Sequence, residues 1–257
     1  MIIEEFKPLT AINGVIRISD VDEAFEKLYL QLRKKEKRIY SDDEVKLLPY
    51  ASKINPHKAE WALRTKSFLR FKKYLSQKKS KLNILDLGCG NGWLTGQLAK
   101  EFEHNYFCID VNLTELEQAA RVFGNENTTF IYTDIFSTSL PANTFDLVII
   151  NAALQYFPNI SALMKELFFI SKTYCDVHII DTPFYDTNEI MHAKNRTLKY
   201  YTSIGYPEMI EKYFHHSFDE FKYFRYSYLY NPNSFKNRLS RFVFDKDSPF
   251  PWIVVTR

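Results

Sequence analysis

The stretch that most constrains this chain runs from Leu82 to Leu98 and reads LNILDLGCGNGWLTGQL. It begins with a short apolar run that contains an acid at Asp86, and a helical pattern ends it. Between them stand three glycines at alternate positions, Gly88, Gly90 and Gly92. This pattern predicts a buried strand, a tight turn, and a helix whose N-terminus faces a ligand that approaches the backbone closely.

After this stretch, apolar runs alternate with helical patterns. We expect strands at residues 84–87, 106–111, 129–132, 145–150 and 177–180, and helices at residues 93–102, 113–123 and 160–173. Several of the runs are apolar throughout, as in parallel strands that are covered on both faces. The alternation therefore predicts an α/β fold with a doubly wound, mostly parallel sheet and right-handed crossovers.

The first 81 residues show helical patterns without this alternation. We expect helices at residues 21–38, at residues 41–49, where Ser41 and Glu44 have capping-box spacing, and at residues 55–77. We therefore predict an N-terminal helical cap over residues 1–81 and a sheet domain over residues 82–257. Aromatic residues are dense in an insertion at about 184–220, which we expect on the substrate side.

Composition and charge limit the classes of protein to which this chain can belong. Of the 257 residues, 46% are hydrophobic, which suffices for a sizeable core. No apolar run approaches the roughly 20 residues of a membrane span, so we expect no transmembrane segment and a cytoplasmic location. The net charge of +3 is too small to favour a nucleic acid partner. Cys89, Cys108 and Cys175 are far apart, and no metal-binding spacing is visible, so no metal is expected.

Polar residues follow the next three expected strands. Asp110 ends the second strand, where an acid can accept hydrogen bonds from both hydroxyls of a ribose. Asp134 ends the third, where its carboxylate and the next amide can contact an adenine edge. The fourth strand ends in Asn151 beside the same cleft. Trp93 occupies the place of the third glycine of the nicotinamide fingerprint, so a dinucleotide is disfavoured.

Together these motifs resemble the class I S-adenosylmethionine-dependent methyltransferases. The resemblance covers roughly Leu82 to Asp181 and rests on DLGCGNG, CID, YTD and FDLVIINAALQYFPN. It implies S-adenosyl-L-methionine as the cofactor and a seven-stranded, Rossmann-like sheet with an antiparallel hairpin at one edge. The segment at residues 221–230 and the closing PFPWIVV would supply that hairpin.

The resemblance also implies cofactor contacts. The methionine part of the cofactor would lie along Gly88, Cys89 and Gly90, and Asp110 would bind the ribose. The adenine would contact Asp134 and Ile135. The opposite side of the cofactor would contact Asn151 and Ala152. Asn91, Gly92 and Val111 complete the expected set. Asp86 either supports the cofactor amine or caps a backbone turn.

The acceptor side gives fewer signals. A general base is needed only if the acceptor carries a proton, and His215 and His216 are the candidates, of which at most one can point into a pocket. Arg64 shares an apolar stripe with Trp61; it either extends past the stripe to solvent or binds the cofactor carboxylate or a substrate acid. The candidate substrate-binding residues are His57, Trp61, Gln155 and Tyr156.

The sequence thus predicts an enzyme that transfers a methyl group by in-line displacement to a small-molecule or carrier-linked acceptor. The turn after the fourth strand reads NAAL rather than the NPPY type, which disfavours adenine or glutamine acceptors. Two alternatives stay open at this point: a catalytically inactive cofactor-binding partner subunit and an NAD-dependent oxidoreductase. The oligomeric state is also left open.

Overall fold

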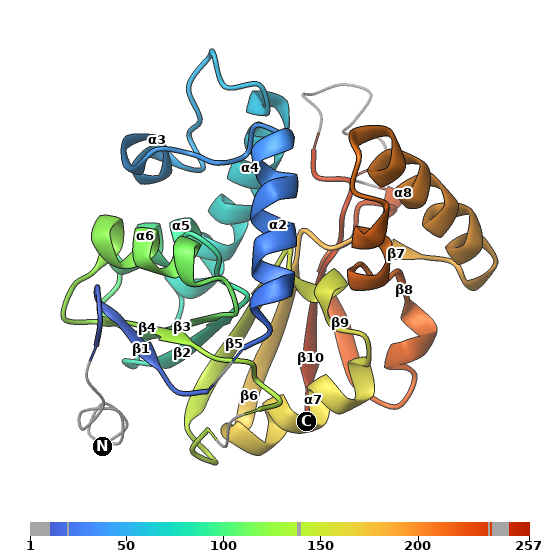
Figure 1. Ribbon diagram of the computed structural model, residues 1–257. Coiled ribbons are helices and arrows are strands. Elements are labelled where there is room, and N and C mark those ends of the chain that lie inside the picture. The colour runs from blue at the N-terminus through green and yellow to red at the C-terminus, as the bar shows by residue number, and fades with distance from the viewer. Residues whose placement is uncertain (1–10, 20, 138–139, 236, 238–246) are drawn as a thin grey trace.

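The computed structural model describes residues 11–19, 21–137, 140–235, 237 and 247–257 (Figure 1). The strands are β1 (Val15–Arg17), β2 (Asn83–Leu87), β3 (Asn105–Asp110), β4 (Thr128–Tyr132), β5 (Phe145–Asn151), β6 (Ser171–Ile180), β7 (Phe184–Tyr185), β8 (His216–Ser217), β9 (Arg225–Tyr230) and β10 (Trp252–Thr256). The α-helices are α2 (Glu23–Lys35), α3 (Asp42–Leu47), α4 (Lys58–Leu75), α5 (Trp93–Ala99), α6 (Leu113–Phe123), α7 (Ile160–Ile170) and α8 (Ile190–Ile204). Short 3₁₀ turns are η1 (Leu154–Tyr156), η2 (Thr187–Glu189), η3 (Pro207–Lys212) and η4 (Phe218–Phe221).

Eight strands form the main sheet in the order β1-β4-β3-β2-β5-β6-β10-β9. Neighbours from β1 to β6 run parallel, whereas β10 pairs antiparallel with both β6 and β9. The predicted α/β class, with a mostly parallel sheet and an antiparallel hairpin at one edge, is confirmed. The carboxyl ends of β2, β3, β4 and β5 therefore meet at one edge of the sheet, which is where such folds bind ligands.

The strand count is eight rather than the seven expected, because the N-terminal segment adds β1. Its three residues pair with β4 in the register Val15 to Phe130, and Val15 is completely buried. A turn with positive φ at Asn13 and Gly14 leads into the strand. So short a strand gives no periodic pattern in the sequence, and residues 1–81 are accordingly more than a helical cap.

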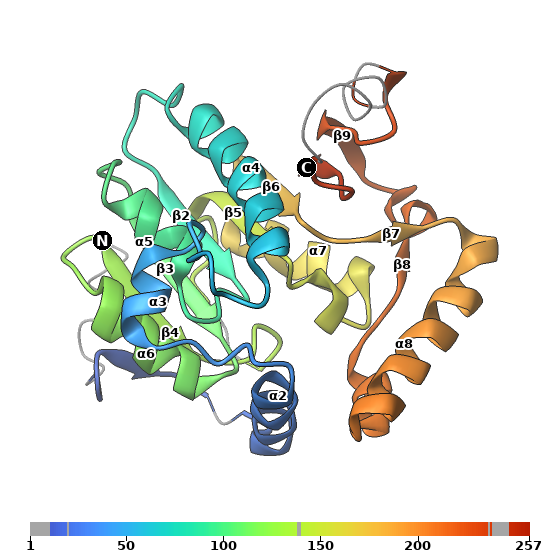
Figure 2. The same ribbon diagram turned by 90° about the horizontal axis from the view of Figure 1, so that it is seen from above.

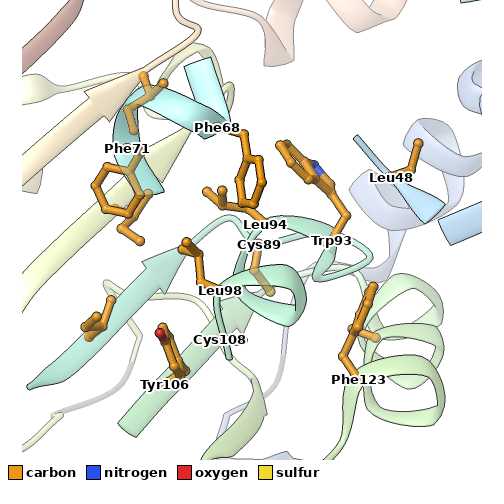
Figure 3. Packing of buried hydrophobic residues seen from close by; sticks show 14 of the residues in the cluster. Leu48, Phe68, Phe71, Cys89, Trp93, Leu94, Leu98, Tyr106, Cys108 and Phe123 are labelled. Carbon is orange, nitrogen blue, oxygen red and sulfur yellow. The ribbon is translucent and has the colours of Figure 1, made fainter. Parts of the chain in front are cut away.

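Helices cover both faces of the sheet. On one face, α4, α5 and α6 pack over the strands, and Figure 3 shows Phe68 beside Trp93 there, with Phe123 further along the same cluster. On the other face, α7 and η4 pack against the same strands. The three cysteines are free and buried in these cores. None of the described helices combines the length and apolar character needed to cross a bilayer.

A smaller core joins two segments that lie far apart in the sequence. Leu32 of α2 packs with Tyr201 of α8 and with Met209 and Ile210 of η3. The Tyr200 hydroxyl, also on α8, donates to Glu36 Oε1 at 2.6 Å. In Figures 1 and 2, α8 lies in a lobe to the side of the main sheet. These contacts bring the N-terminal helix and the aromatic insertion together beside the sheet edge.

His178 makes the stability of this fold depend on pH. It is completely buried beside Phe71, Tyr74 and Trp252, and Trp252 Nε1 donates to its Nδ1 at 3.1 Å. Burial lowers the pKa of His178 to about 3, whereas an unfolded histidine titrates near about 6.5. Between these values the unfolded chain binds a proton that the folded chain does not, so the free energy of unfolding falls as pH falls.

We therefore expect His178→Gln to weaken the pH dependence of stability between pH 6.5 and 5 by about 1 kcal/mol per pH unit. Urea denaturation at several pH values measures this, with the exposed His192→Gln as the control. Identical slopes for the wild type and His178→Gln would contradict a buried neutral histidine.

Candidate active site

The glycine turn between β2 and α5 lets a ligand reach the backbone. Gly88 and Gly90 have φ values of 73° and 54°, a region that favours glycine. A Cβ added at Gly88 would lie 2.5 Å from the Ala153 Cβ, so no larger residue fits without movement. Gly92, with a φ of 70°, is the N-cap of α5. The turn thus has the tight form predicted from its sequence.

Asp110 fixes this turn to the next strand. Its Oδ2 accepts from Gly90 N at 2.7 Å, and its Oδ1 accepts from Asn112 N at 2.9 Å. Burial raises the pKa of Asp110 to about 6, while the backbone donors act in the opposite direction. Each carboxylate oxygen retains further acceptor capacity, so Asp110 can still accept from a ligand hydroxyl.

Two adjoining cavities lie at this edge of the sheet. The smaller has a volume of ≈ 110 Å³ and contains Asp110 and Asp134 in its wall. The larger has a volume of ≈ 510 Å³ and extends toward α4 and α8. Six residues line both cavities: Tyr29, Gly88, Gly90, Glu115, Ala152 and Tyr156. The cavities therefore share a wall at the glycine turn.

Most residues predicted from the sequence lie in these walls. The smaller cavity is lined by Gly88, Gly90, Asp110, Val111, Asp134, Ile135, Ala152 and Tyr156. The larger is lined by Arg64, Trp61, Gly88, Cys89, Gly90, Asn91, Asn151, Ala152, Gln155 and Tyr156. The structure thus gathers residues from the glycine turn and the ends of three further strands around one site, while their individual roles stay predictions.

Asp86 and Gly92 line neither cavity. Asp86 is buried and accepts from Thr95 Oγ1 at 2.6 Å, which ties β2 to the first turn of α5. Burial raises the pKa of Asp86 to about 7. The donor to Asp86 is a side-chain hydroxyl and not a backbone N–H, so both roles considered for Asp86 stay predictions.

His57 also lies outside the cavities. Its Nε2 is 2.8 Å from the Glu36 carbonyl oxygen, and its backbone N–H donates to Asn55 Oδ1. These contacts hold the start of α4 against the segment that follows α2. The substrate contact expected of His57 stays a prediction, and its ring makes a contact within the protein.

The two histidines proposed as bases do not line the cavities either. His216 is buried, with Nδ1 3.2 Å from the Glu220 carboxylate and Nε2 3.2 Å from the Leu154 carbonyl oxygen. His215 Nε2 lies 2.8 Å from Thr197 Oγ1, and its ring packs against Tyr213. Thr197 and Tyr213 do line the larger cavity, so His215 stands behind them. Neither ring is positioned to take a proton directly from a molecule in the cavity.

A chain of alternating charges forms one wall of the larger cavity. Arg33 Nη1 lies 2.9 Å from Glu36 Oε2, Arg38 Nη2 lies 2.6 Å from Glu60 Oε2, and Arg64 Nη2 lies 3.0 Å from Glu60 Oε1. Burial raises the pKa of Glu60, but Arg38 and Arg64 together lower it to about 2. Arg196 and Glu115 also line this cavity, so four arginines stand against three glutamates in its wall.

The sequence reading missed the contributions of α2 and α6. Phe25, Glu26 and Tyr29 cover the smaller cavity, and Arg33 enters the larger one. Phe25, Tyr29 and Arg33 recur at a spacing of four residues, which places them on one helix face. From that spacing, a common helix face could have been predicted for these three residues. Glu115 lines both cavities but reads in the sequence as an ordinary acid in the first turn of a helix.

Residues 84–173 match a family described as "Methyltransferase domain". An uncharacterized methyltransferase of Mycobacterium bovis is 31% identical over 84 residues, which cover 33% of this chain and 42% of that protein. A malonyl-[acyl-carrier protein] O-methyltransferase of Bacillus cereus is 28% identical over 146 residues, which cover 54% of each chain. The chain thus matches about half or less of the length of these relatives.

The fold of this chain is similar to the folds of solved proteins. The YcgJ protein of Bacillus subtilis has a TM-score of 0.54 at 13% identity and covers 75% of this chain and 99% of its own. A proposed S-adenosyl-L-methionine-dependent methyltransferase of Methanococcus maripaludis has a TM-score of 0.51 at 14% identity, with 84% and 93% covered. At these identities the likeness shows the fold alone.

The site fits the cofactor of this family, S-adenosyl-L-methionine. Gly88 and Gly90 line both cavities and carry no side chain, so a ligand in either cavity can approach the backbone of the turn closely. Asp110 has acceptor capacity for a ribose, and the apolar walls beside Asp134 suit an adenine ring. The oxidoreductase alternative is set aside by the family match.

Proposed function

We propose that this chain, which belongs to the class I S-adenosylmethionine-dependent methyltransferases through residues 84–173, methylates a carboxylate on a small or carrier-linked acid. The observation that carries the proposal is the larger cavity, in whose wall arginines outnumber glutamates and into which neither candidate histidine base projects. A guanidinium matches a carboxylate in charge and in planar, two-pronged geometry.

A carboxylate acceptor explains why no base is required. At neutral pH a carboxylate has already lost its proton, so the oxygen attacks without proton transfer. The positions of His215 and His216, behind Thr197 and against Glu220, are compatible with such an acceptor. An amine or hydroxyl acceptor would instead need a group in the cavity to receive its proton.

The remaining work of the protein is alignment and exclusion of water. When bound, S-adenosyl-L-methionine supplies an electrophilic methyl group on a sulfonium. The glycine turn and Asp110 would hold the donor, and the arginine wall would orient the acceptor carboxylate. Trp61, Tyr156 and Tyr213 line the larger cavity and would shield the reacting atoms from solvent.

The names of relatives support a carrier-linked acid. The Bacillus cereus relative acts, by its name, on malonyl-[acyl-carrier protein], an acid attached to a carrier. The test uses S-adenosylmethionine labelled with tritium in the methyl group and three acceptors: malonyl-acyl carrier protein, malonyl-coenzyme A and butyryl-acyl carrier protein. We expect label on one or both malonyl acceptors and none on the butyryl form, which lacks a free carboxylate. Binding of S-adenosylhomocysteine without transfer to either malonyl acceptor would overturn this proposal and favour a noncatalytic partner subunit.

A second prediction concerns Arg64, which binds either the acceptor acid or the cofactor carboxylate. The two possibilities change different binding constants. Arg64→Gln removes a charge that also stacks 5.3 Å from the Trp61 ring centre, and we expect about a tenfold loss of affinity for one ligand. If Arg64 binds the acceptor acid, the KM for the acceptor rises while the Kd for S-adenosylhomocysteine stays constant. If it binds the cofactor carboxylate, that Kd rises. A variant that changes neither constant would show that Arg64 has no ligand in the cavity.

A further inference from the structure

We propose that Glu115 is a cofactor-binding residue whose carboxylate pairs with one of the two positive groups in the methionine part of S-adenosylmethionine, the ammonium or the sulfonium. The inference rests on the proposed function for the identity of the cofactor and for the place of the acceptor in the larger cavity. Nothing in the sequence motifs assigned Glu115 a role, and its position in the first turn of α6 alone would not imply one.

The first step is position. Glu115 is the only residue with a carboxyl group among the six described residues that line both cavities. Its Oε2 lies 3.1 Å from the point where a Cβ of Gly90 would stand, so the carboxylate lies close against the glycine turn. Because methyl transfer joins a donor in one cavity to an acceptor in the other, the donor sulfur must lie near this shared wall.

The second step is that the Glu115 carboxylate does not make the capping hydrogen bond that is usual at its position in a helix. A glutamate three residues after an N-cap commonly accepts a hydrogen bond from the N-cap backbone N–H. Here Asn112 is the N-cap, and its side chain does accept from Glu115 N at 3.0 Å. The Asn112 N–H, however, donates to Asp110 Oδ1. Within the described residues no hydrogen bond reaches the Glu115 carboxylate, which leaves it available to a ligand.

The third step is the charge around Glu115. From β3, Asp110 opposes its ionisation, and from α2, Glu26 does the same while Arg33 favours ionisation; Tyr29 also faces it. Burial, with the charges of Asp110 and Glu26, outweighs Arg33 and raises the pKa of Glu115 to about 7. A cation placed against the group would favour the ionised form, so binding should release a proton near neutral pH.

The experiment is isothermal titration calorimetry at pH 7 in two buffers with different ionisation enthalpies, which counts protons released on binding. The ligands are S-adenosylmethionine, S-adenosylhomocysteine, which keeps the ammonium but lacks the sulfonium, and methylthioadenosine, which has neither charge. The proteins are the wild type, Glu115→Gln, and Glu117→Gln as a control on the same helix, since Glu117 accepts from Asn13 and lines neither cavity.

We expect the wild type to release about 0.5 proton per S-adenosylmethionine more than Glu115→Gln, and Glu115→Gln to bind this cofactor about tenfold more weakly at pH 8. Methylthioadenosine should bind both proteins equally, which shows that the adenosine site is intact. If protons are also released when S-adenosylhomocysteine binds, Glu115 contacts the ammonium. If protons are released only when S-adenosylmethionine binds, Glu115 contacts the sulfonium.

Two results would overturn the inference: equal proton release and equal cofactor affinity in the wild type and Glu115→Gln, or an equal loss of methylthioadenosine binding in the variant. Both leave the proposed function standing, because the wild type still binds the cofactor. Failure of the wild type to bind all three ligands would instead remove the proposed function itself.

Discussion

Asp110→Asn is expected to weaken the binding of S-adenosylhomocysteine by about 100-fold. The two carboxylate oxygens accept from Gly90 N and Asn112 N. An asparagine has one oxygen, so whichever way its amide turns, an NH₂ group meets a backbone N–H donor. The glycine turn and the start of α6 then lose their common anchor, and the ribose loses a charged acceptor.

A matched control separates this effect from the general loss of a half-buried carboxylate. Asp146 also accepts a backbone N–H, from Asn83 at 2.8 Å, but it lies near the amino end of β5 and lines neither cavity. Calorimetry on Asp146→Asn should give the wild-type Kd. If Asp110→Asn also gave the wild-type Kd, the assignment of the smaller cavity to the adenosyl group would be wrong.

Gly96→Ala is expected to lower the free energy of unfolding by about 3 kcal/mol. Gly96 lies inside α5, and a Cβ there would come within 2.2 Å of the Phe123 ring on α6. In Figure 3, Phe123 projects from its helix near α5. Alanine is the better helix former by about 1 kcal/mol, so a loss can come only from the clash between the two helices.

Urea denaturation measures this difference, and two further variants test the cause. Gly205→Ala has no atom within 4 Å of its added Cβ, although its φ is 90°, so it should lose only about 1 kcal/mol through backbone strain. Gly96→Ala combined with Phe123→Leu should recover part of the loss. A stable Gly96→Ala single variant would contradict the close packing of α5 on α6.

The sequence was sufficient to predict which residues lie at the site where their position follows from the adjacent residues. The glycine turn, Asp110 and Asp134 were found because their backbone positions at strand ends determine what they can contact. Cys89, Asn151 and Ala152 follow from the same strands, and all line a cavity. The hairpin of β9 and β10 was likewise visible, because Tyr226, Tyr228 and Tyr230 alternate along the strand.

The sequence was insufficient where a residue's role depends on distant partners. His216 looked like a free base until the fold placed Glu220 and the Leu154 carbonyl against its ring. Arg33 became a cavity residue because α2 packs against α8 and η3, a contact that no local pattern encodes. Glu115 was passed over because its freedom depends on Asp110 taking the Asn112 N–H.

The measurement that tests the account most directly is a crystal structure with S-adenosylhomocysteine bound. We predict that the ribose hydroxyls contact Asp110, that the adenine lies beside Asp134 and Ile135, and that the sulfur lies at the wall shared by the two cavities, over Gly88 and Gly90. An adenosyl group bound outside the smaller cavity, or a sulfur directed away from the arginine-lined cavity, would contradict the proposed methyl transfer.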